Sequence, residues 1–559
     1  MKIRSLGFTL FLLLFWSTLW GQFDGGSGTV EDPYWVATSD QLNQVRYNLS
    51  AHYHQTADIN LARPPYNVDE GWTPIGTLSD PFIGSYDGDN HQIWGLFIRK
   101  PSGYNGLFGV AYNADIRNIT LCSADVICGY PSAALVGRLE FSTLSNSKIE
   151  FSMVKGYDFT GGMVSFAYAS EIIGCRANVG IEGCESVGGI VGLLTTSVIR
   201  DCAVELISSN NCRYQVGGVV GTADGGSSII DCSFEGDLHG SSWVGGIVGQ
   251  ASDTLISGCT AGIGLLSGGD TCGGIVGDTE RVNIVNCFST MDVNTIYIAG
   301  GLVGSLRSFS TVQNCHASGH VNTGWPAGGF VGQMSNSAIS NCFSTGTVDG
   351  IRTSGGFAGW IITSGSFVQN CYSTGLVTSI EYTPGGFAGS GDAANVVNCY
   401  WDMQSSACPS SPVGEGRNTI QMHYPGDAST YVNWDFEHNW GWEGEPPAGY
   451  PVLRIFPVSN SDPHAPAISD LMIRVFPNPF TSGTQISFDL AKAGKCSVKI
   501  YDLKGRLLRR LTDSHLSPGT HQFSFDACDD NGRKLCSGIY LVAIQQDGRQ
   551  SVRRITVMK

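Results

Sequence analysis

One phrase returns about every 28 residues, a step in the range of solenoid repeats, and it constrains the fold more than any other feature of the chain. Gly-Gly pairs begin at positions 161, 188, 217, 245, 273, 300, 328, 355 and 385, and weaker copies, NGLFG at 105 and AALVG at 133, precede them. A unit of this length cannot bury its apolar side alone, so successive units must stack on one another. The sequence therefore predicts about eleven stacked coils.

A second phrase keeps the same step and identifies the coils as strands. Cysteines stand at 175, 202, 232, 259, 287, 315, 342, 371 and 399, and three residues before each of them lies Ile or Val. Short β-branched runs bounded by Gly, Ser and Asn are typical of β-strands. Strands that stack in register lie about 4.8 Å apart, so equivalent residues form columns. We expect an all-β parallel solenoid with Ile, Val and Cys columns inside it.

Glycine, asparagine and cysteine each have a place in such a coil. The backbone must turn sharply, and Gly accepts positive φ while Asn tolerates it better than most residues. We expect the Gly-Gly pairs and the Gly, Asp or Asn before each ladder cysteine to serve these bends. Parallel rungs are poorly placed for disulfides, so the nine cysteines should be buried free thiols. A disulfide between Cys528 and Cys536, which flank DDNGRKL, is left open.

Both ends of the solenoid need protection, because open ends expose unpaired strand edges. Residues 1–21 have the basic start and short apolar run of a secretory signal peptide; the alternative is a membrane anchor. Residues 22–80 form the predicted N-terminal cap, with a helix over 39–49 opened by Thr38-Ser39-Asp40. Residues 402–458, rich in Trp and Pro, form the predicted C-terminal cap, and 459–467 a linker.

The repeats resemble the GLUG-repeat proteins of bacterial surfaces. The residues that carry this resemblance are GGIVG, GGLVG and GGFVG, several of them after NC and an aromatic residue, together with the entry segment GGSGTVEDPYWVATSDQLNQV and the exit segment NCYWDMQSSACPS. The resemblance covers about residues 24–456, with the solenoid at 81–401. It implies a right-handed parallel β-solenoid and assigns no activity.

The last part of the chain, residues 468–559, has alternating strands and no repeat, which predicts a small immunoglobulin-like β-sandwich. PNP near its start, VKIYDLKGR, DDNGR followed by SGIY, and the basic last strand closely resemble the C-terminal sorting domain of type IX secretion cargo. The resemblance implies export across an outer membrane, to the cell surface or the medium, with the type IX machinery as partner. The alternative is an immunoglobulin-like module without a sorting role.

The distribution of charge argues against a nucleic-acid partner. Residues 468–559 hold 14 Lys and Arg against 8 Asp and Glu, so the remainder of the chain holds 18 against 40. Nucleic acid would require a basic stripe, and the body of the protein is acidic. Apart from the signal segment no stretch is apolar enough to span a membrane, so the mature chain is expected to have no transmembrane segment.

Motifs for common chemistry are missing, and the acids show no convincing pair. HExxH, GxSxG and the P-loop pattern do not occur, and the sequence predicts no catalytic residue, no metal site and no cofactor. His52 and His54 read as an ordinary strand pair. Asp87 and Asp89 in YDGDN fit a turn, as Asp201 and Asp231 fit bends.

The candidate binding residues follow the ladder cysteines in the last five coils. If each cysteine faces inward, the next residue faces outward, and an aromatic ridge runs along the rod. Such rings can stack on sugars or pack at interfaces; the alternative is that they stack on one another or shelter beneath loops. The five residues are Phe288, His316, Phe343, Tyr372 and Tyr400.

The leading hypothesis is a non-catalytic secreted or surface protein that binds an extracellular glycan or protein along one rigid side, because stacked repeats make extended binding surfaces. The second is a carbohydrate-active enzyme, a polysaccharide lyase or hydrolase, on the same scaffold. The third is a passive surface spacer. Acids grouped with Arg or Lys across three adjacent coils would favour the enzyme.

Overall fold

The chain divides into two compact units, Met1–Phe456 and Pro457–Lys559. The computed structural model describes residues 23–129, 131–209, 212–362, 365–392, 395–443, 448–454, 474–476, 480, 483–490, 493–502, 506–530, 532–535, 538–546 and 549–557. The signal-peptide segment 1–21, the linker 459–467 and Cys536 lie outside these residues.

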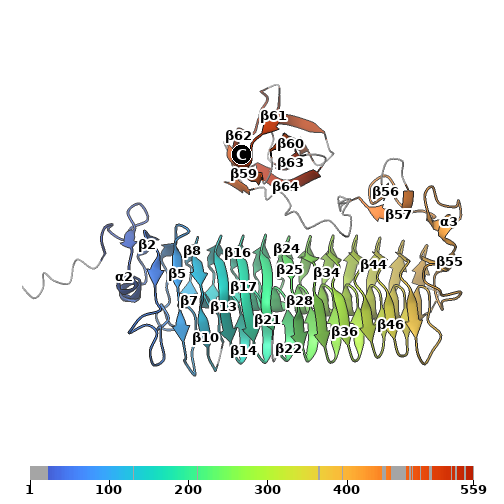
Figure 1. Cartoon of the computed structure of the whole chain (residues 1–559), viewed down its shortest axis with the longest axis horizontal. Coiled ribbons are helices and arrows are strands. Elements are labelled where there is room, and N and C mark those ends of the chain that lie inside the picture. Colours follow the sequence, from blue (N-terminus) through green and yellow to red (C-terminus); the bar gives the residue numbers. More distant parts are fainter. Residues whose placement is uncertain are drawn as a thin grey trace, which may run out of the picture. The chain divides into compact units, whose positions relative to one another are not determined.

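The first unit is a parallel β-solenoid (Figure 1). Sheet 1 has 14 strands, from β1 (Tyr34–Val36) and β2 (His52–Gln55) to β53 (Val396–Val397). Sheet 2 has 16 strands and runs from β3 (Ile59–Asn60) to β54 (Tyr400–Asp402) and β55 (Glu415–Arg417). Sheet 3 has 11 strands, one for each predicted coil, from β7 (Phe108–Tyr112) to β52 (Ala388–Ser390).

Two shorter sheets complete the later coils. Sheet 4 has eight strands, from β14 (Asp158–Gly161) to β47 (Ser354–Gly355). Sheet 5 has six strands, from β26 (Leu238–Gly240) to β51 (Val377–Ser379). The predicted all-β solenoid of about eleven coils is confirmed.

The coils stack in register, as the recurring Ile, Val and Cys positions predicted. Ile172, Ile199, Ile229 and Ile256 are directly paired from one coil to the next, and all nine ladder cysteines are buried and free. The rungs also bond to each other: the Cys287 N–H donates to the sulfur of Cys315 at 3.3 Å, and the Cys287 thiol donates to the Val285 carbonyl at 3.3 Å. Burial raises the pKa of the Cys287 thiol, so this rung is neutral as well as apolar.

The bend before each cysteine has the backbone that was expected. The residue at that position has positive φ in every coil of the ladder, for example 57° at Asn286 and 53° at Asn314. The Gly-Gly pairs were expected to serve the same purpose, and for them the expectation is wrong: none of the nine pairs has positive φ. They are glycine because backbones approach closely. A Cβ on Gly300 would lie 2.0 Å from the Val303 carbonyl oxygen, and one on Gly301 would lie 2.2 Å from that of Gly329.

A second ladder, of hydroxyl groups, lies five residues before the cysteines. The N–H of Ser142 donates to the Ser170 oxygen at 3.1 Å, that of Ser170 to Ser197 at 3.0 Å, and that of Ser197 to Ser227 at 3.2 Å. These buried hydroxyls accept hydrogen bonds from backbone N–H groups at a bend, where no neighbouring strand offers a carbonyl partner. The recurrence of serine at this offset was present in the sequence and was not recognised.

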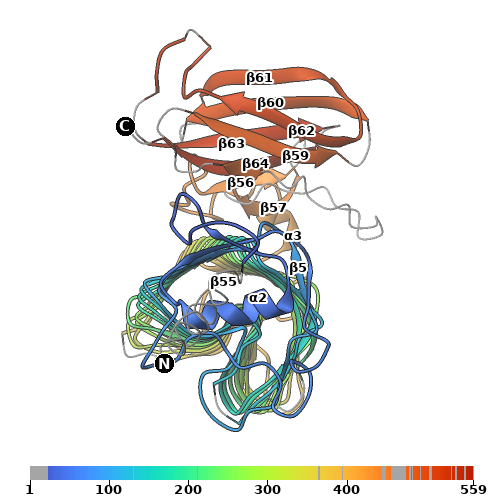
Figure 2. The ribbon, with the colours of Figure 1, turned by 90° about the vertical axis from the view of Figure 1, so that its left-hand side faces the viewer.

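The N-terminal segment covers its end of the solenoid. The predicted helix over 39–49 is α2 (Ser39–Gln44) followed by the 3₁₀ turn η1 (Val45–Tyr47), and Thr38 and Gln41 form a capping box. Leu42 and Val45 belong to the solenoid core, and Figure 2 shows α2 lying across the opening. Strands β1 and β2 extend sheet 1, so this segment also continues the coils.

The C-terminal segment 402–456 does two things. Its first part covers the end, where Cys408 and Val413 join the solenoid core. Its second part contains α3 (Thr419–Met422) and the antiparallel pair β56 (Trp440–Glu443) and β57 (Ala448–Leu453). Residues 418–443 and 448–454 of this part pack against the outer face of sheet 2, and we call them the side cap.

The second unit is a β-sandwich of two antiparallel sheets. One contains β58 (Arg474–Phe476), β59 (Thr484–Leu490) and β62 (Gly519–Phe525). The other contains β61 (Leu507–Leu516), β60 (Gly494–Asp502), β63 (Gly538–Gln546) and β64 (Arg549–Val557), in that order. Ile486 and Phe488 of the first sheet and Val498 and Ile544 of the second share one core.

Candidate functional site

The five predicted binding residues do form a column on the outer face of sheet 2. They lie in β35 (Phe288–Ser289), β40 (His316–Ala317), β45 (Phe343–Ser344), β50 (Tyr372–Ser373) and β54, each paired in register with the next. The first four rings stack with centroids 4.8–5.0 Å apart and planes within 2–3°. Stacking on both sides leaves the faces of the inner rings no room for a ligand.

The side cap covers most of this column. Phe343, Tyr372 and Tyr400 keep only 8%, 1% and 1% of their surface exposed, because Trp434, Trp440, Leu453 and their neighbours pack on them. The Tyr372 hydroxyl donates to the Pro451 carbonyl at 2.8 Å. The expectation of an open ridge is therefore wrong for these three residues. Binding at the partly exposed Phe288 and His316 stays a prediction.

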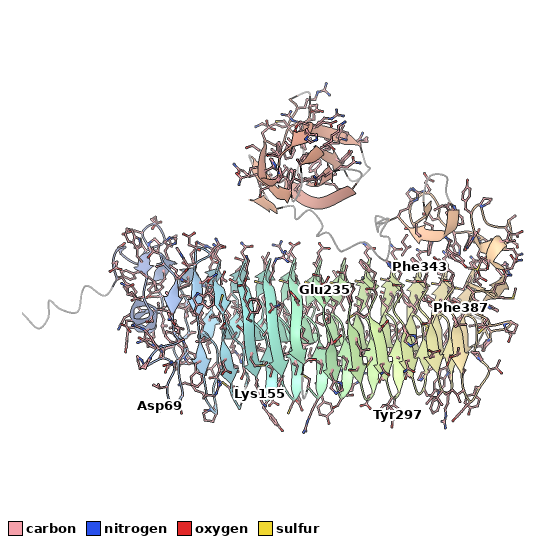
Figure 3. The ribbon with its side chains drawn as sticks, in the orientation of Figure 1. Asp69, Lys155, Glu235, Tyr297, Phe343 and Phe387 are labelled. Atoms are coloured by element: carbon pink, nitrogen blue, oxygen red, sulfur yellow. The ribbon has the colours of Figure 1, made fainter. Side chains whose placement is uncertain are left out.

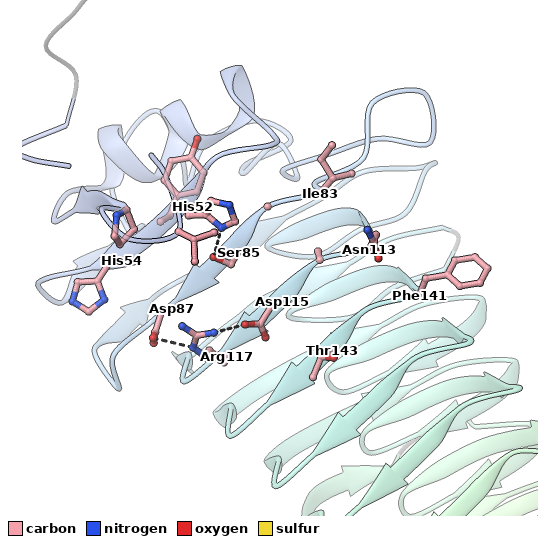
Figure 4. A pocket seen from close by; sticks show the side chains of 15 residues that line it. His52, His54, Ile83, Ser85, Asp87, Asn113, Asp115, Arg117, Phe141 and Thr143 are labelled. Carbon is pink, nitrogen blue, oxygen red and sulfur yellow. Dashed lines mark hydrogen bonds and ion pairs between the residues drawn. The ribbon is translucent and has the colours of Figure 1, made fainter. Parts of the chain in front are cut away.

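A polar hollow of about 420 Å³ lies on the outer face of sheet 1, near its N-terminal end (Figure 4). Register builds it from β2, β4 (Ser85–Asp87) and β8 (Asp115–Arg117), since His52 pairs with Ser85 and Ser85 with Asp115. The His52 Nδ1 atom lies 2.8 Å from the Ser85 hydroxyl. His52 and His54 belong to one strand, as predicted.

Arg117 joins the two carboxylates of this hollow. Its Nε donates to Asp87 at 3.0 Å, and its Nη1 forms an ion pair with Asp115. Partial burial raises the pKa of Asp87, but hydrogen bonds from Asn118, the Asp89 N–H and Arg117 outweigh it, and the pKa is lowered. A general acid needs a raised pKa, and the lowered pKa of Asp87 does not suit that role.

The sequence reading missed this cluster. Asp89 lies in a turn with φ of 47°, as expected, but Asp87 belongs to a strand and faces Arg117 of the next coil. The step from Asp87 to Arg117 is 30 residues, longer than the usual period, so the repeat did not align them. Among the residues that the structure describes, no group of three or more His, Cys, Asp or Glu side chains is placed to hold a metal ion.

Family models match two parts of the chain. The GLUG motif matches residues 213–238 and 324–349, and the FlgD Ig-like domain matches residues 477–550. Both agree with the architecture: the first two segments are solenoid coils and the third is the sandwich. No helix in the described ranges is long and apolar enough to cross a membrane.

Two curated relatives resemble part of this chain. A putative Gly-rich membrane protein of Evansella cellulosilytica is 32% identical over 180 residues, which are 30% of this chain and 21% of that one. An immunoglobulin A1 protease of Streptococcus pneumoniae is 27% identical over 246 residues, 40% of this chain and 12% of that one. The chain thus spans less than a quarter of the length of these relatives.

The solved structures that match this chain superpose poorly on it as a whole. A putative immunoglobulin A1 protease from Bacteroides ovatus has a TM-score of 0.30 at 16% identity and covers 78% of this chain and 96% of that one. PorZ of Porphyromonas gingivalis, a surface component of the type IX secretion system, has a TM-score of 0.13 at 30% identity over 16% of this chain and 11% of that one.

Proposed function

We propose that this is a non-catalytic surface or secreted protein that binds an extracellular glycan or protein through the side of its solenoid. The matched GLUG motifs and the rigid, in-register coils support a display scaffold, since stacked repeats give long binding surfaces. The acidic body favours ligands other than nucleic acid.

The observation that carries the non-catalytic part is the paired state of Arg117. It forms ion pairs with both Asp87 and Asp115, the acids that adjacent coils bring together in the polar hollow. Glycosidases instead keep one carboxyl group protonated beside an ionised partner. A carbohydrate-active enzyme is the second candidate, because acids and an arginine do meet there across adjacent coils.

One experiment separates the three hypotheses. The mature protein is incubated with a panel of polysaccharides and extracellular matrix proteins, and binding and new sugar ends are both measured. Binding without cleavage supports the scaffold. Cleavage that Asp115→Asn abolishes supports the enzyme. Neither binding nor cleavage supports a passive spacer.

Export by type IX secretion is part of the proposal. The motifs in residues 468–559 and the sandwich fold of that unit support it. We expect deletion of 468–559 to trap the protein in the periplasm, measured by cell fractionation. Normal appearance outside the cell after this deletion would refute the sorting role, and deletion of one complete internal coil provides the control for a shortened chain.

A further inference from the structure

A second concave surface lies away from the covered ridge. It is a shallow groove of about 440 Å³ between sheets 3 and 4, and Figure 3 places its Tyr297 at the opposite edge of the solenoid from Phe343. Three of its residues are large exposed aromatics: Tyr297 is 55% exposed, Trp325 42% and Trp360 38%. From this groove we infer that the protein binds a neutral polysaccharide, with the rings of Tyr297, Trp325 and Trp360 as the stacking surfaces.

Register of the coils assembles the groove. Tyr297 and Trp325 occupy equivalent places just before β37 (Ile298–Gly300) and β42 (Ala327–Gly328), and the Trp325 N–H donates to the Tyr297 carbonyl at 3.0 Å. Trp360 projects from β48 (Ala358–Ile361), where it pairs with Gln333. The rings therefore come from successive coils, so a chain-like ligand can contact more than one of them.

The ring faces of Tyr297 and Trp360 are available, unlike those of the ridge. In the ridge His316 and Phe343 each stack on both neighbours. In the described part of the protein, Tyr297 and Trp360 have no aromatic partner, and Trp325 is contacted by the Arg352 guanidinium, 5.1 Å from its ring centre. Glu381 in turn holds Arg352 with a 2.8 Å ion pair. This arrangement orients Trp325 before any ligand arrives, which lowers the entropic cost of binding.

The polar groups of the groove fit sugar hydroxyls. The Tyr297 hydroxyl and the indole N–H groups of Trp325 and Trp360 make no hydrogen bond within the described residues, and Asp270 and Gln333 also line the groove. A neutral sugar ring offers C–H groups to an aromatic face and hydroxyls to donors and acceptors around it. The cation beside the groove, Arg352, is already paired with Glu381, and the body of the protein is acidic, so neither favours an acidic polymer.

This inference rests on the proposed binding function and adds the site and the ligand class. The test uses the full mature protein with laminarin, dextran, mannan and xyloglucan as probes, read by tryptophan fluorescence and by affinity electrophoresis. Trp325→Ala and Trp360→Ala are the test variants. Trp94→Ala is the matched control, because Trp94 is also 42% exposed and lies near the other end of the solenoid.

We expect at least one probe to bind, and each test variant to weaken its binding by about tenfold or more, the loss equivalent to about 1.4 kcal/mol. Trp94→Ala should bind as the wild type does. Binding should also persist from about 0.1 M to about 1 M salt, over which the Debye length falls from about 10 Å to about 3 Å.

Three results would overturn the inference. If a probe binds equally to all variants, the groove is not the site, although the proposed binding function stands. The same holds if no polysaccharide binds and an apolar peptide or protein binds at Trp325. If nothing binds, the inference and the proposed function fall together.

Discussion

The aromatic column beneath the side cap makes a measurable prediction at Tyr372. This ring is 1% exposed, stacks on Phe343 at 5.0 Å and lies 6.0 Å from the rings of Trp440 and Tyr450. Truncating a buried aromatic ring to alanine costs about 3–5 kcal/mol, and the lost hydrogen bond to Pro451 accounts for about 1 kcal/mol of it. We expect Tyr372→Ala to destabilise the packing of the side cap by about 4 kcal/mol, and Tyr372→Phe by about 1 kcal/mol.

Hydrogen exchange of the backbone amides in β56 and β57 measures this effect, because these strands rest on the column and can open without the solenoid unfolding. A loss of about 4 kcal/mol corresponds to exchange roughly a thousandfold faster. Phe309→Ala is the control, since Phe309 is 78% exposed and its loss should leave these amides unchanged. Unchanged exchange in Tyr372→Ala would refute the conclusion that the column holds the side cap.

Three further predictions concern the solenoid. The ladder thiols should resist alkylation in the native protein, because burial raises the pKa of Cys259 and Cys287. Most of them should react once the protein is denatured without a reductant. Failure of the denatured protein to label would mean that the thiols form disulfides. Burial lowers the pKa of His316 in the folded protein to about 4. Between about pH 6.5 and pH 4 this histidine is therefore protonated in the unfolded chain and neutral in the folded one. The free energy of unfolding should fall by about 1.4 kcal/mol for each pH unit of acidification in this range. Denaturant titrations at pH 7 and pH 5 should show this loss in the wild type and a smaller one in His316→Phe; equal losses would contradict it. At the bend, Asn314→Gly should be nearly neutral and Asn314→Val should cost about 1–2 kcal/mol, because φ is 53° there; equal melting temperatures for the two would exclude strain.

The local features of the coil could be read from the sequence because they repeat. Asn286 and Asn314 were assigned to bends and have positive φ, and the neighbouring cysteines are buried. The Gly-Gly pairs were located correctly and explained wrongly, since the need for glycine at Gly301 comes from the Gly329 carbonyl oxygen of an adjacent coil. A sequence period shows that a position is constrained and does not show which neighbour constrains it.

The sites were harder to predict because they depend on contacts outside the period. Tyr372 meets Pro451, 79 residues away, in a segment with no repeat. Asp87 meets Arg117 across a step of 30 residues, which differs from the 28-residue step of the next coil. The groove residues Tyr297 and Trp325 are one period apart, and a search for aromatics at equal offsets beyond the cysteine column would have found this pair.

The hydroxyl and thiol ladders have a consequence for the length of the rod. Each rung bonds within its own layer and to the layers directly above and below it, as Ser170 does with Tyr168, Ser142 and Ser197. A whole coil can therefore be excised or duplicated without creating a new kind of contact, provided that the cut removes one complete period. The distance between the aromatic groove and either end of the solenoid is then an adjustable quantity, set by how many layers the gene encodes.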